Sequence, residues 1–313
     1  MNNKIGVLVM SYGTPESLEQ VEAYYTHIRR GNPPAEDQLK ELKDRYEAIV
    51  GGVFPLRANT DNQVAALQET LNRAAEGLGV QFVCYQGLKH AAPFIEDGVD
   101  QMAKDGITRA VGIVLAPHYS VMSVGSYIKR AEEKAAEHKI KFSFVQSYHL
   151  HPKLIQALAQ RVSRKLDQFE EAGAERDKVK VLFSAHSLPE KILEMGDPYQ
   201  DQLLETSTEV AEQCGVTNWQ FTWQSAGRTA TPWLGPDILD TLRDLSIEQV
   251  EDVLVAPVGF VSDHLEVLYD LDIEAQAVAG ELDMRLMRTD SLNTDPLYME
   301  TLSDVIIKAW EEE

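Results

Sequence analysis

Short runs of hydrophobic residues alternate along the chain with longer stretches in which hydrophobic residues recur every three or four positions. The short runs predict buried β-strands and the longer stretches predict amphipathic helices, so we expect βα units around parallel sheets. This order occurs twice. The first four strands are expected at residues 5–11, 82–88, 110–115 and 142–147, and the second four at 179–184, 219–224, 253–258 and 284–288.

The residues that follow the strands are also similar in the two halves. Leu115-Ala-Pro-His118, for example, corresponds to Val255-Ala-Pro-Val258. The sequence therefore predicts an α/β protein of two similar Rossmann-like domains, residues 1–150 and 151–313, with a central cleft between them. Ligands of parallel sheets bind at the carboxyl ends of the strands, so the side chains that follow the strands are the candidates for function.

The first half contains an additional segment, at about residues 14–57, between its first strand and the helix that leads to the second. Pro15 is expected to begin a helix that ends at Gly31, and a second helix should end near Gly51 and Gly52. We expect this segment to act as a lid. Further helices are predicted at residues 152–171, which connect the domains, and at 296–310, which can pack on either half.

Three carboxylates follow the strand at 253–258 with a spacing of four residues, at Glu266, Asp270 and Glu274. On a helix over residues 259–274 they lie along one face, where each pair of like charges costs roughly 0.2–0.5 kcal/mol. An acidic surface facing water is the ordinary explanation of such a row. Because this row follows a buried strand, a series of oxygen ligands for a divalent cation is the alternative.

His186 follows the strand predicted at 179–184 and should share a sheet edge with Glu266. A single histidine is more often structural, but one beside a carboxylate can take up protons near neutral pH. A serine hydrolase is excluded, because the sequence has no G-x-S-x-G and the segment around Ser225 lacks the first glycine. The chain also lacks nucleotide-binding glycine motifs, and no zinc spacing is recognised among His118, His149 and His151.

Composition restricts the class of protein further. No apolar stretch of the 313 residues approaches the ~20 that a membrane span requires, and the first ten residues resemble a strand more than a signal peptide, which predicts a cytoplasmic protein. A net charge of −21 argues against nucleic acid. Cys84 and Cys214 form no C-x-x-C, so neither disulfides nor a cysteine-ligated cluster is expected. Only the region of residues 29–57 is close to charge balance, which favours a site for a small anion.

Several segments, in this order, resemble signatures of the ferrochelatase family, most closely its soluble Gram-positive form, over nearly the whole chain. They include Tyr24-Tyr-Thr-His-Ile-Arg-Arg30, Gly87-Leu-Lys-His90, Ser184-Ala-His-Ser-Leu-Pro189 and Val258-Gly-Phe-Val-Ser-Asp-His-Leu-Glu266. The resemblance implies a type II chelatase fold and the insertion of Fe²⁺ into a porphyrin in heme biosynthesis, with coproporphyrin III as the expected substrate. It implies no required cofactor, no iron–sulfur cluster, and transient contacts with other enzymes of heme synthesis.

The resemblance also implies roles for individual residues. His186 and Glu266 match the catalytic pair and contact the metal, Asp270 and Glu274 match an outward acidic row that can hold an accessory divalent cation, and Tyr12 matches a tyrosine that can contact the metal. The predicted substrate-binding residues, which include two at the end of the strand at 219–224, are Tyr12, Arg29, Arg30, Arg45, Lys89, His90, Tyr127, Trp223 and Ser225. Two departures, the extra residue Val50 and Phe54 in place of a serine, put the propionate contacts of that loop in doubt.

The chemistry agrees with these residue types. Insertion of a dication into a porphyrin removes two pyrrole protons and strips water from the metal, which requires a proton acceptor and weakly binding oxygen ligands. Which of His186 and Glu266 accepts protons and which delivers metal stays open at this stage. The alternatives are a protoporphyrin IX ferrochelatase, a non-catalytic carrier of tetrapyrrole or metal, and a cobalt chelatase, which the long lid disfavours.

Overall fold

The computed structural model describes residues 4–49, 54–227 and 229–312. The chain divides into two compact units, one comprising Met1–Tyr148 with Asn293–Glu313 and the other His149–Leu292. The division lies close to the boundary predicted at residue 150. The predicted boundary also assigned the last helix to the second domain, whereas the structure places it in the first unit.

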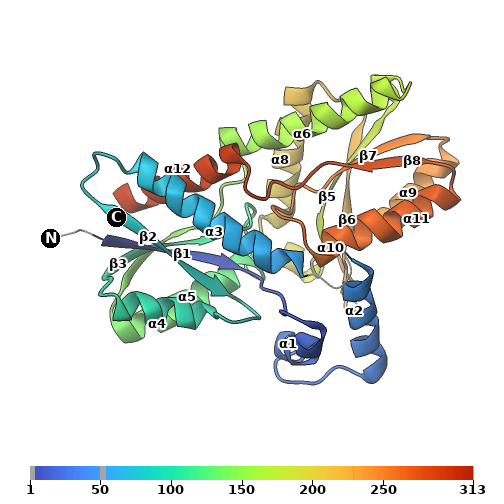
Figure 1. Cartoon of the computed structure of the whole chain (residues 1–313). Helices are drawn as coiled ribbons and strands as arrows, with labels where there is room; N and C mark the ends of the chain where they lie inside the picture. The colour runs from blue at the N-terminus through green and yellow to red at the C-terminus, as the bar shows by residue number, and fades with distance from the viewer. Residues whose placement is uncertain (1–3, 50–53, 228, 313) are drawn as a thin grey trace. The chain divides into compact units, whose positions relative to one another are not determined.

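The first unit is built on a four-stranded parallel sheet with the order β2-β1-β3-β4 (Figure 1). Helices cover both faces: α3 and α12 contact each other and one face, and α4 and α5 contact each other and the opposite face. The elements are β1 Lys4–Ser11, α3 Pro55–Ala74, β2 Gln81–Leu88, α4 Ile95–Lys104, β3 Arg109–Val114, α5 Val124–His138, β4 Lys141–Val145 and α12 Pro296–Glu311.

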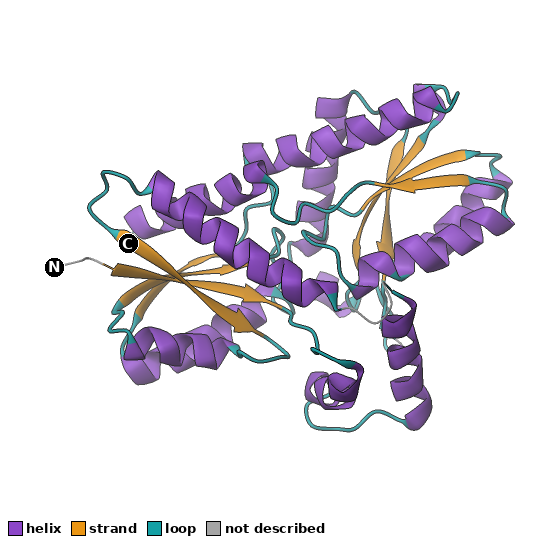
Figure 2. Ribbon diagram, viewed as in Figure 1, coloured by secondary structure: helices purple, strands orange, loops and turns teal. Residues whose placement is uncertain are grey.

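The second unit repeats this arrangement, with a parallel sheet of order β6-β5-β7-β8 (Figure 1). In Figure 2 the strands of each sheet are orange and the helices that cover them are purple. Helices α6 and α8 pack together against one face, and α9 and α11 pack together against the other. The elements are α6 Pro152–Glu171, β5 Lys180–His186, α7 Lys191–Glu194, α8 Tyr199–Cys214, β6 Trp219–Gln224, α9 Ile238–Ile247, β7 Asp252–Ala256, α11 Gln276–Glu281 and β8 Arg285–Arg288. All eight strands predicted from the sequence are therefore present.

The hydrophobic runs form strands because both faces of each sheet are covered. In β1 every residue after Lys4 is buried, and in β7 every residue after Asp252 is buried. Continuous burial of this kind is typical of central strands in parallel sheets, whose two faces both meet helices. The edge strands β4 and β8 are buried less regularly. The carboxyl ends of β1 and β5 consequently stand at the centre of their sheets.

The inserted segment after β1 contains two helices, as the sequence predicts, but the first begins later than Pro15. A 3₁₀ turn, η1 Leu18–Gln20, precedes α1 Val21–Ile28, and α2 spans Glu36–Ala48. The delay has a local cause: Ser17 is extended, and the Gln20 side chain accepts a hydrogen bond from the Glu16 N–H at 3.1 Å. The predicted helix ends at Gly51 and Gly52, and the extra residue Val50, lie outside the described residues.

The helix predicted over residues 259–274 is corrected in two ways. It begins only at Leu265, because residues 257–263 run along the end of β5; the Gly259 N–H bonds to the Ser184 carbonyl at 3.1 Å, and a Cβ on Gly259 would lie 2.4 Å from that of Ala185. It is also irregular, with α10 Leu265–Leu268 followed by a π-helical segment, η3 Asp270–Ala275, and then α11. A π-helix has more residues per turn than an α-helix, so each residue rotates less around the helix axis. The π segment therefore counteracts the rotation by which residues four apart drift around an α-helix.

Candidate functional site

The carboxyl edge of the second sheet brings together the residues predicted to act on metal. His186 is the last residue of β5, and the loop after β7 leads to Glu266 at the start of α10. The strand order reverses direction between β5 and β7, which hydrogen-bond to each other although β6 lies between them in sequence. Such a switch point leaves a crevice at the strand ends where ligands of α/β sheets bind.

A carboxylate between two histidines forms the centre of this edge. Glu266 Oε1 lies 3.3 Å from His186 Nε2, and Glu266 Oε2 lies 3.5 Å from His264 Nε2. The side chains of His186 and Glu266 keep about a third of their surface exposed, at 32% and 34%. His264 was not among the residues predicted from the sequence. The signal that could have found it is its position two residues before Glu266, within Asp-His-Leu-Glu.

The charges of this pair depend on each other. Burial alone would lower the pKa of His186, but the Glu266 carboxylate outweighs burial and raises the pKa to about 9. The pKa of Glu266 would likewise rise on burial, and it is instead held below its usual range by His186 first and His264 second. At neutral pH the pair is therefore an imidazolium facing a carboxylate, and a cation arriving at Glu266 would compete directly with the His186 proton.

Buried polar contacts fix the orientation of both residues. The His186 ring bonds through Nδ1 to the carbonyl of Ser187, and the Tyr199 hydroxyl donates to the backbone carbonyl of His186 at 3.1 Å. Gln224, which is 1% exposed, accepts a hydrogen bond from Ser184 Oγ at 2.9 Å and donates to the Glu266 carbonyl at 2.9 Å. These contacts link the ends of β5 and β6 to the start of α10.

Asp270, the second carboxylate of the row, is buried and receives a hydrogen bond from Ser225. Ser225 has a φ of 59°, a left-handed conformation that costs energy for a residue with a side chain. The strained backbone at the end of β6 therefore belongs to the residue whose hydroxyl bonds to Asp270. Among the described residues, no three or more histidine, cysteine or acidic side chains form a ready metal cage. The edge offers sparse ligands rather than a closed site.

The carboxyl edge of the first sheet has the opposite charge. Lys89, which follows β2, donates to Ser126 Oγ at 2.7 Å and lies 4.8 Å from the centre of the Tyr127 ring. Arg130 donates to the Lys89 carbonyl at 2.7 Å and makes two bonds to Glu96, of 2.6 and 2.8 Å. Burial, then the charges of Arg130 and Arg30, lower the pKa of Lys89 to about 8. No described carboxylate forms an ion pair with this half-buried cation.

His90 lies next to Lys89 and makes contacts with two other rings. Its Nδ1 is 3.0 Å from Nδ1 of His27, and its ring centre is 4.6 Å from that of Tyr12. Burial, followed by the charge of Lys89, lowers the pKa of His90 to about 3, so the imidazole is neutral at physiological pH. Tyr12 is 42% exposed at the end of β1. The structure thus places Tyr12, Lys89 and His90 at one sheet edge.

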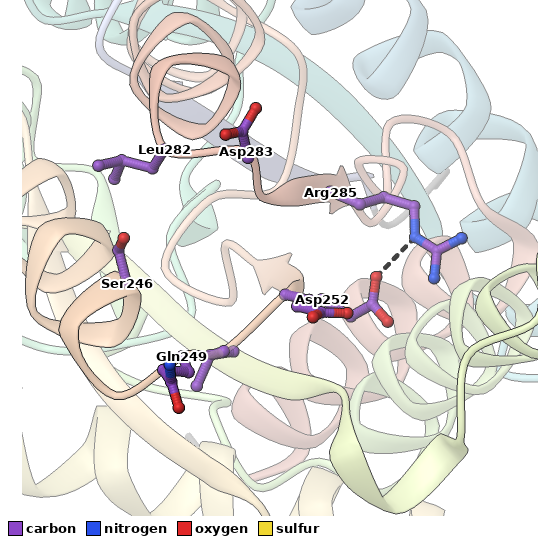
Figure 3. Close-up of a pocket in the computed structure, with 8 residues that line it drawn as sticks. Ser246, Gln249, Asp252, Leu282, Asp283 and Arg285 are labelled. Atoms are coloured by element: carbon purple, nitrogen blue, oxygen red, sulfur yellow. Dashed lines mark hydrogen bonds and ion pairs between the residues drawn. The ribbon is translucent and has the colours of Figure 1, made fainter.

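A surface cavity of about 510 Å³ opens at the other edge of the second sheet, where β7 and β8 begin (Figure 3). Asp252 and Arg285 in its wall form an ion pair of 2.6 Å. Because ligands of parallel sheets bind at the carboxyl ends of the strands, this cavity at the amino ends has no part in the site above.

Comparison with known proteins agrees with the chemistry of the His186 and Glu266 edge. The model of the family described as Ferrochelatase matches residues 4–310. The chain belongs to the ferrochelatase family. It is 47% identical to the coproporphyrin III ferrochelatase of Geobacillus kaustophilus, over 98% of this chain and 96% of that protein. It is 46% identical to the coproporphyrin III ferrochelatase of Staphylococcus aureus, over 98% of this chain and 99% of that protein.

Solved chelatase structures share the fold at low sequence identity. The sirohydrochlorin chelatase SirB from Bacillus subtilis subspecies spizizenii, in complex with cobalt, has a TM-score of 0.56 at 11% identity, over 99% of this chain and 96% of that one. CbiX, described as the terminal enzyme of siroheme biosynthesis in denitrifying bacteria, has a TM-score of 0.53 at 12% identity, over 97% of this chain and 98% of that one. The predicted type II chelatase fold is therefore confirmed.

The remaining residues that the sequence predicted to bind substrate fall into two groups. Arg29 and Arg30 are exposed at the end of α1, Arg29 lies 5.7 Å from the Tyr25 ring centre, and Arg45 is on α2. Tyr127 and Trp223, in contrast, are each 4% exposed. Tyr127 packs beneath Lys89, and Trp223 packs against Phe221 and Tyr199 with ring centres 4.9 and 6.0 Å apart.

Phe54, where the sequence suggested a lost propionate contact, has a structural role. It is 7% exposed and packs against Tyr46, with ring centres 4.6 Å apart and the rings tilted by 38°. The Tyr46 hydroxyl in turn lies 3.2 Å from Thr14 Oγ1. The phenyl ring therefore stabilises the base of the inserted segment by hydrophobic contact, which a serine could not do. Among the described residues, no helix is both long and apolar enough to cross a membrane.

Proposed function

We propose that this ferrochelatase inserts Fe²⁺ into coproporphyrin III and forms coproheme in the synthesis of heme. The observation that carries the proposal is the pair of His186 and Glu266 at the switch point of the second sheet, with a nitrogen to oxygen distance of 3.3 Å. Relatives named as coproporphyrin III ferrochelatases match this chain along almost their whole length. Iron is the substrate in this scheme, and no resident cofactor is required.

His186 and Glu266 are the proposed catalytic residues, acting in a defined order. Fe²⁺ accepts both carboxylate and imidazole ligands. When Fe²⁺ reaches Glu266, its charge opposes the proton on His186, and the imidazolium releases that proton to solvent water and becomes a neutral imidazole. The neutral ring can then contact the metal or accept a pyrrole proton. Each of the two pyrrole protons leaves the porphyrin as the metal takes its place, so the charge at this edge stays nearly balanced.

The acidic row is the proposed path by which the metal approaches. Asp270 and Glu274 follow Glu266 along α10 and η3, and oxygen ligands exchange hard cations more readily than a closed cage does. An accessory divalent cation can occupy this row. We propose that Tyr12 is a further metal contact.

The cationic edge of the first unit and the inserted helices are the proposed receptors of the propionates. Lys89, Arg29, Arg30 and Arg45 supply charges, His90 supplies a polar contact, and Tyr127 supports Lys89 from beneath. In the second unit, Ser225 and Trp223 are further proposed substrate-binding residues. Coproporphyrin III has four propionates and protoporphyrin IX has two, so a cationic receptor favours the former. Charge-assisted hydrogen bonds of about 1.5–3 kcal/mol each give the expected size of the preference.

An anaerobic assay tests this proposal. The protein is mixed with Fe²⁺ and either coproporphyrin III or protoporphyrin IX, and the Soret band is followed with time. We expect many turnovers per protein molecule, with a higher kcat/KM for coproporphyrin III at low salt and a smaller difference at high salt. Formation of only one equivalent of product would indicate a carrier, and a higher kcat/KM for protoporphyrin IX would overturn the assignment of substrate. The cytoplasmic location and transient contacts with other enzymes of heme synthesis are part of the same proposal.

A further inference from the structure

The segment that carries the acidic row is attached to both edge strands of the second sheet. At the end of β6, Ser225 bonds to Asp270 and Gln224 bonds to the Glu266 carbonyl. At the end of β8, Arg288 bonds to Asp272. Because the strand order is β6-β5-β7-β8, these two attachments lie on opposite sides of His186, which ends β5.

Arg288 engages every nitrogen of its guanidinium group. Nε and Nη2 donate to the two Asp272 oxygens at 2.7 and 2.8 Å, and Nη1 donates to the Thr289 carbonyl at 3.0 Å. Nη1 also lies 3.4 Å from Asp263 Oδ1, which accepts a hydrogen bond from Ser291 Oγ at 2.8 Å. The Arg288 side chain is only 15% exposed. The arrangement is a two-pronged contact that a lysine cannot reproduce.

The two carboxylates that Arg288 holds are neighbours of the proposed metal-handling residues. Asp263 precedes His264, and Asp272 lies between Asp270 and Glu274. Carboxylate oxygens are good ligands for divalent cations. The chain therefore places five carboxylates between residues 263 and 274, and a single arginine neutralises two of them.

We propose that Arg288 is a positioning residue for iron insertion, which keeps Asp263 and Asp272 away from the metal and fixes η3 so that Glu266 and Asp270 face His186 in a constant orientation. This inference rests on the proposed insertion of iron. Without the guanidinium, Asp263 and Asp272 become additional oxygen ligands beside the row. The metal is then held more tightly and delivered more slowly, so turnover falls although metal binding does not weaken.

The experiment compares Arg288→Met with Arg285→Met. Arg285 begins the same strand and pairs with Asp252 at 2.6 Å, but at the amino edge of the sheet (Figure 3). Kinetics with coproporphyrin III and Fe²⁺ should show kcat reduced about tenfold in Arg288→Met, with the KM for iron equal to or below that of wild type. Arg285→Met should stay within about twofold of wild type in both constants. Arg288→Lys should have a higher kcat than Arg288→Met, because lysine restores the positive charge but cannot make the two parallel hydrogen bonds of the guanidinium group.

A metal-binding measurement without porphyrin separates this inference from the proposed function. Calorimetric titration with Zn²⁺ should show tighter binding to Arg288→Met than to wild type, and unchanged binding to Arg285→Met. If wild type inserts no iron but the Zn²⁺ difference appears, the proposed function fails and the neutralising role of Arg288 stands. If wild type inserts iron and Arg288→Met keeps both wild-type kcat and wild-type Zn²⁺ affinity, only this inference fails.

Two further outcomes guard against a merely structural role. An equal loss of kcat in Arg288→Met and Arg285→Met would overturn the proposal, as would a rise in the KM for iron at unchanged kcat. Should Arg288→Met fail to fold, Asp272→Asn provides the test, because the amide keeps the shape of the side chain and removes its charge. This variant should lower kcat about threefold and should add nothing further when combined with Arg288→Lys; wild-type kcat in Asp272→Asn would refute the proposal.

Discussion

The carboxyl edges of the two sheets have the same strand order but opposite electrostatics. At the second sheet a carboxylate raises the pKa of His186 to about 9, and at the first sheet burial beside Lys89 lowers the pKa of His90 to about 3. The scaffold is the same, with the inner strands ending at the centre of each sheet. The few residues placed after each strand therefore decide whether an edge attracts a cation or an anion.

The difference matches the two substrates of a ferrochelatase. A metal cation requires the anionic edge with Glu266 and Asp270, and a ring that carries carboxylates requires the cationic edge with Lys89. A chain with a net charge of −21 can hold such a ring only where its cations are concentrated. We therefore propose that metal chemistry belongs mainly to the second unit and recognition of the propionates mainly to the first.

The largest effect is expected at His186. His186→Ala removes the imidazole that we propose contacts the metal and accepts protons, so iron insertion should fall by about 100-fold or more, as for loss of a general base. Binding of coproporphyrin III, measured by quenching of its fluorescence, should change by less than about tenfold. His138→Ala is a matched control, because His138 Nε2 also lies 2.5 Å from a carboxylate, that of Asp100. Retention of more than a tenth of wild-type turnover would remove His186 from the mechanism.

Glu266→Gln should lower the pKa of His186 at the carboxyl edge of the second sheet. With the carboxylate gone, burial remains as the main influence, and the pKa of His186 should fall from about 9 to below its ordinary value of 6.5. The titration of the His186 ring by NMR measures this change directly, and iron insertion should be reduced nearly as much as in His186→Ala. A His186 pKa that stays near 9 would mean that another group sets it.

The same shift makes stability depend on pH in a defined direction. The folded pKa of His186 lies above the unfolded one, so its contribution is complete below about pH 6.5 and is lost as pH rises through about 9. The folded pKa of Glu266 lies below the unfolded one, so its contribution is lost as pH falls below its ordinary pKa of 4.5. The melting temperature of Glu266→Gln should therefore lie furthest below that of wild type between about pH 4.5 and pH 6.5, where both contributions are present.

Lys89→Met should weaken the binding of the porphyrin ring rather than the binding of the metal. Loss of a charge-assisted hydrogen bond of about 1.5–3 kcal/mol predicts an increase of roughly 10- to 150-fold in the Kd for coproporphyrin III. The KM for iron should change little. Because the Lys89 amine has a pKa of about 8, the wild-type advantage should disappear as pH rises through that value. Lys104→Met, at an exposed position on α4, is the control, and equal Kd values for the two variants would contradict the assignment.

The smallest effect is expected from the outer acidic row. Asp270→Asn combined with Glu274→Gln should raise the KM for iron about threefold and change kcat less, as for an approach path. An unchanged KM for iron would mean that Asp270 and Glu274 take no part in the delivery of iron. Glu248→Gln with Glu281→Gln, at the ends of α9 and α11, provides a control with the same loss of charge.

Much of the fold follows from the sequence because its signals are local. The helix predicted at residues 152–171 matches α6, which begins at Pro152, where a missing N–H is harmless. The strands were found because runs buried on both faces stand out from helical periodicity. The residues after the strands pointed to His186 and Glu266 because chain order and sheet topology together place the ends of β5 and β7 at one edge.

What the sequence did not show depends on contacts between distant residues. A spacing of four residues suggests a regular helix, and nothing in that spacing reveals the π segment from Asp270 or the late start at Leu265. The support of His186 by Tyr199, and of Glu266 by Gln224, requires strands and helices to be packed first. The location of α12 was equally hidden, because its apolar face would satisfy either domain.

The packing of α12 determines the order in which the units can be completed during protein synthesis. Tyr298 on α12 is fully buried, and its hydroxyl lies 3.1 Å from that of Tyr148. The first unit therefore needs α12, which is made after every element of the second unit. Domains usually fold in the order of their synthesis. In this chain the second unit is expected to reach its native state first, and the unit that begins the sequence only once α12 has been made.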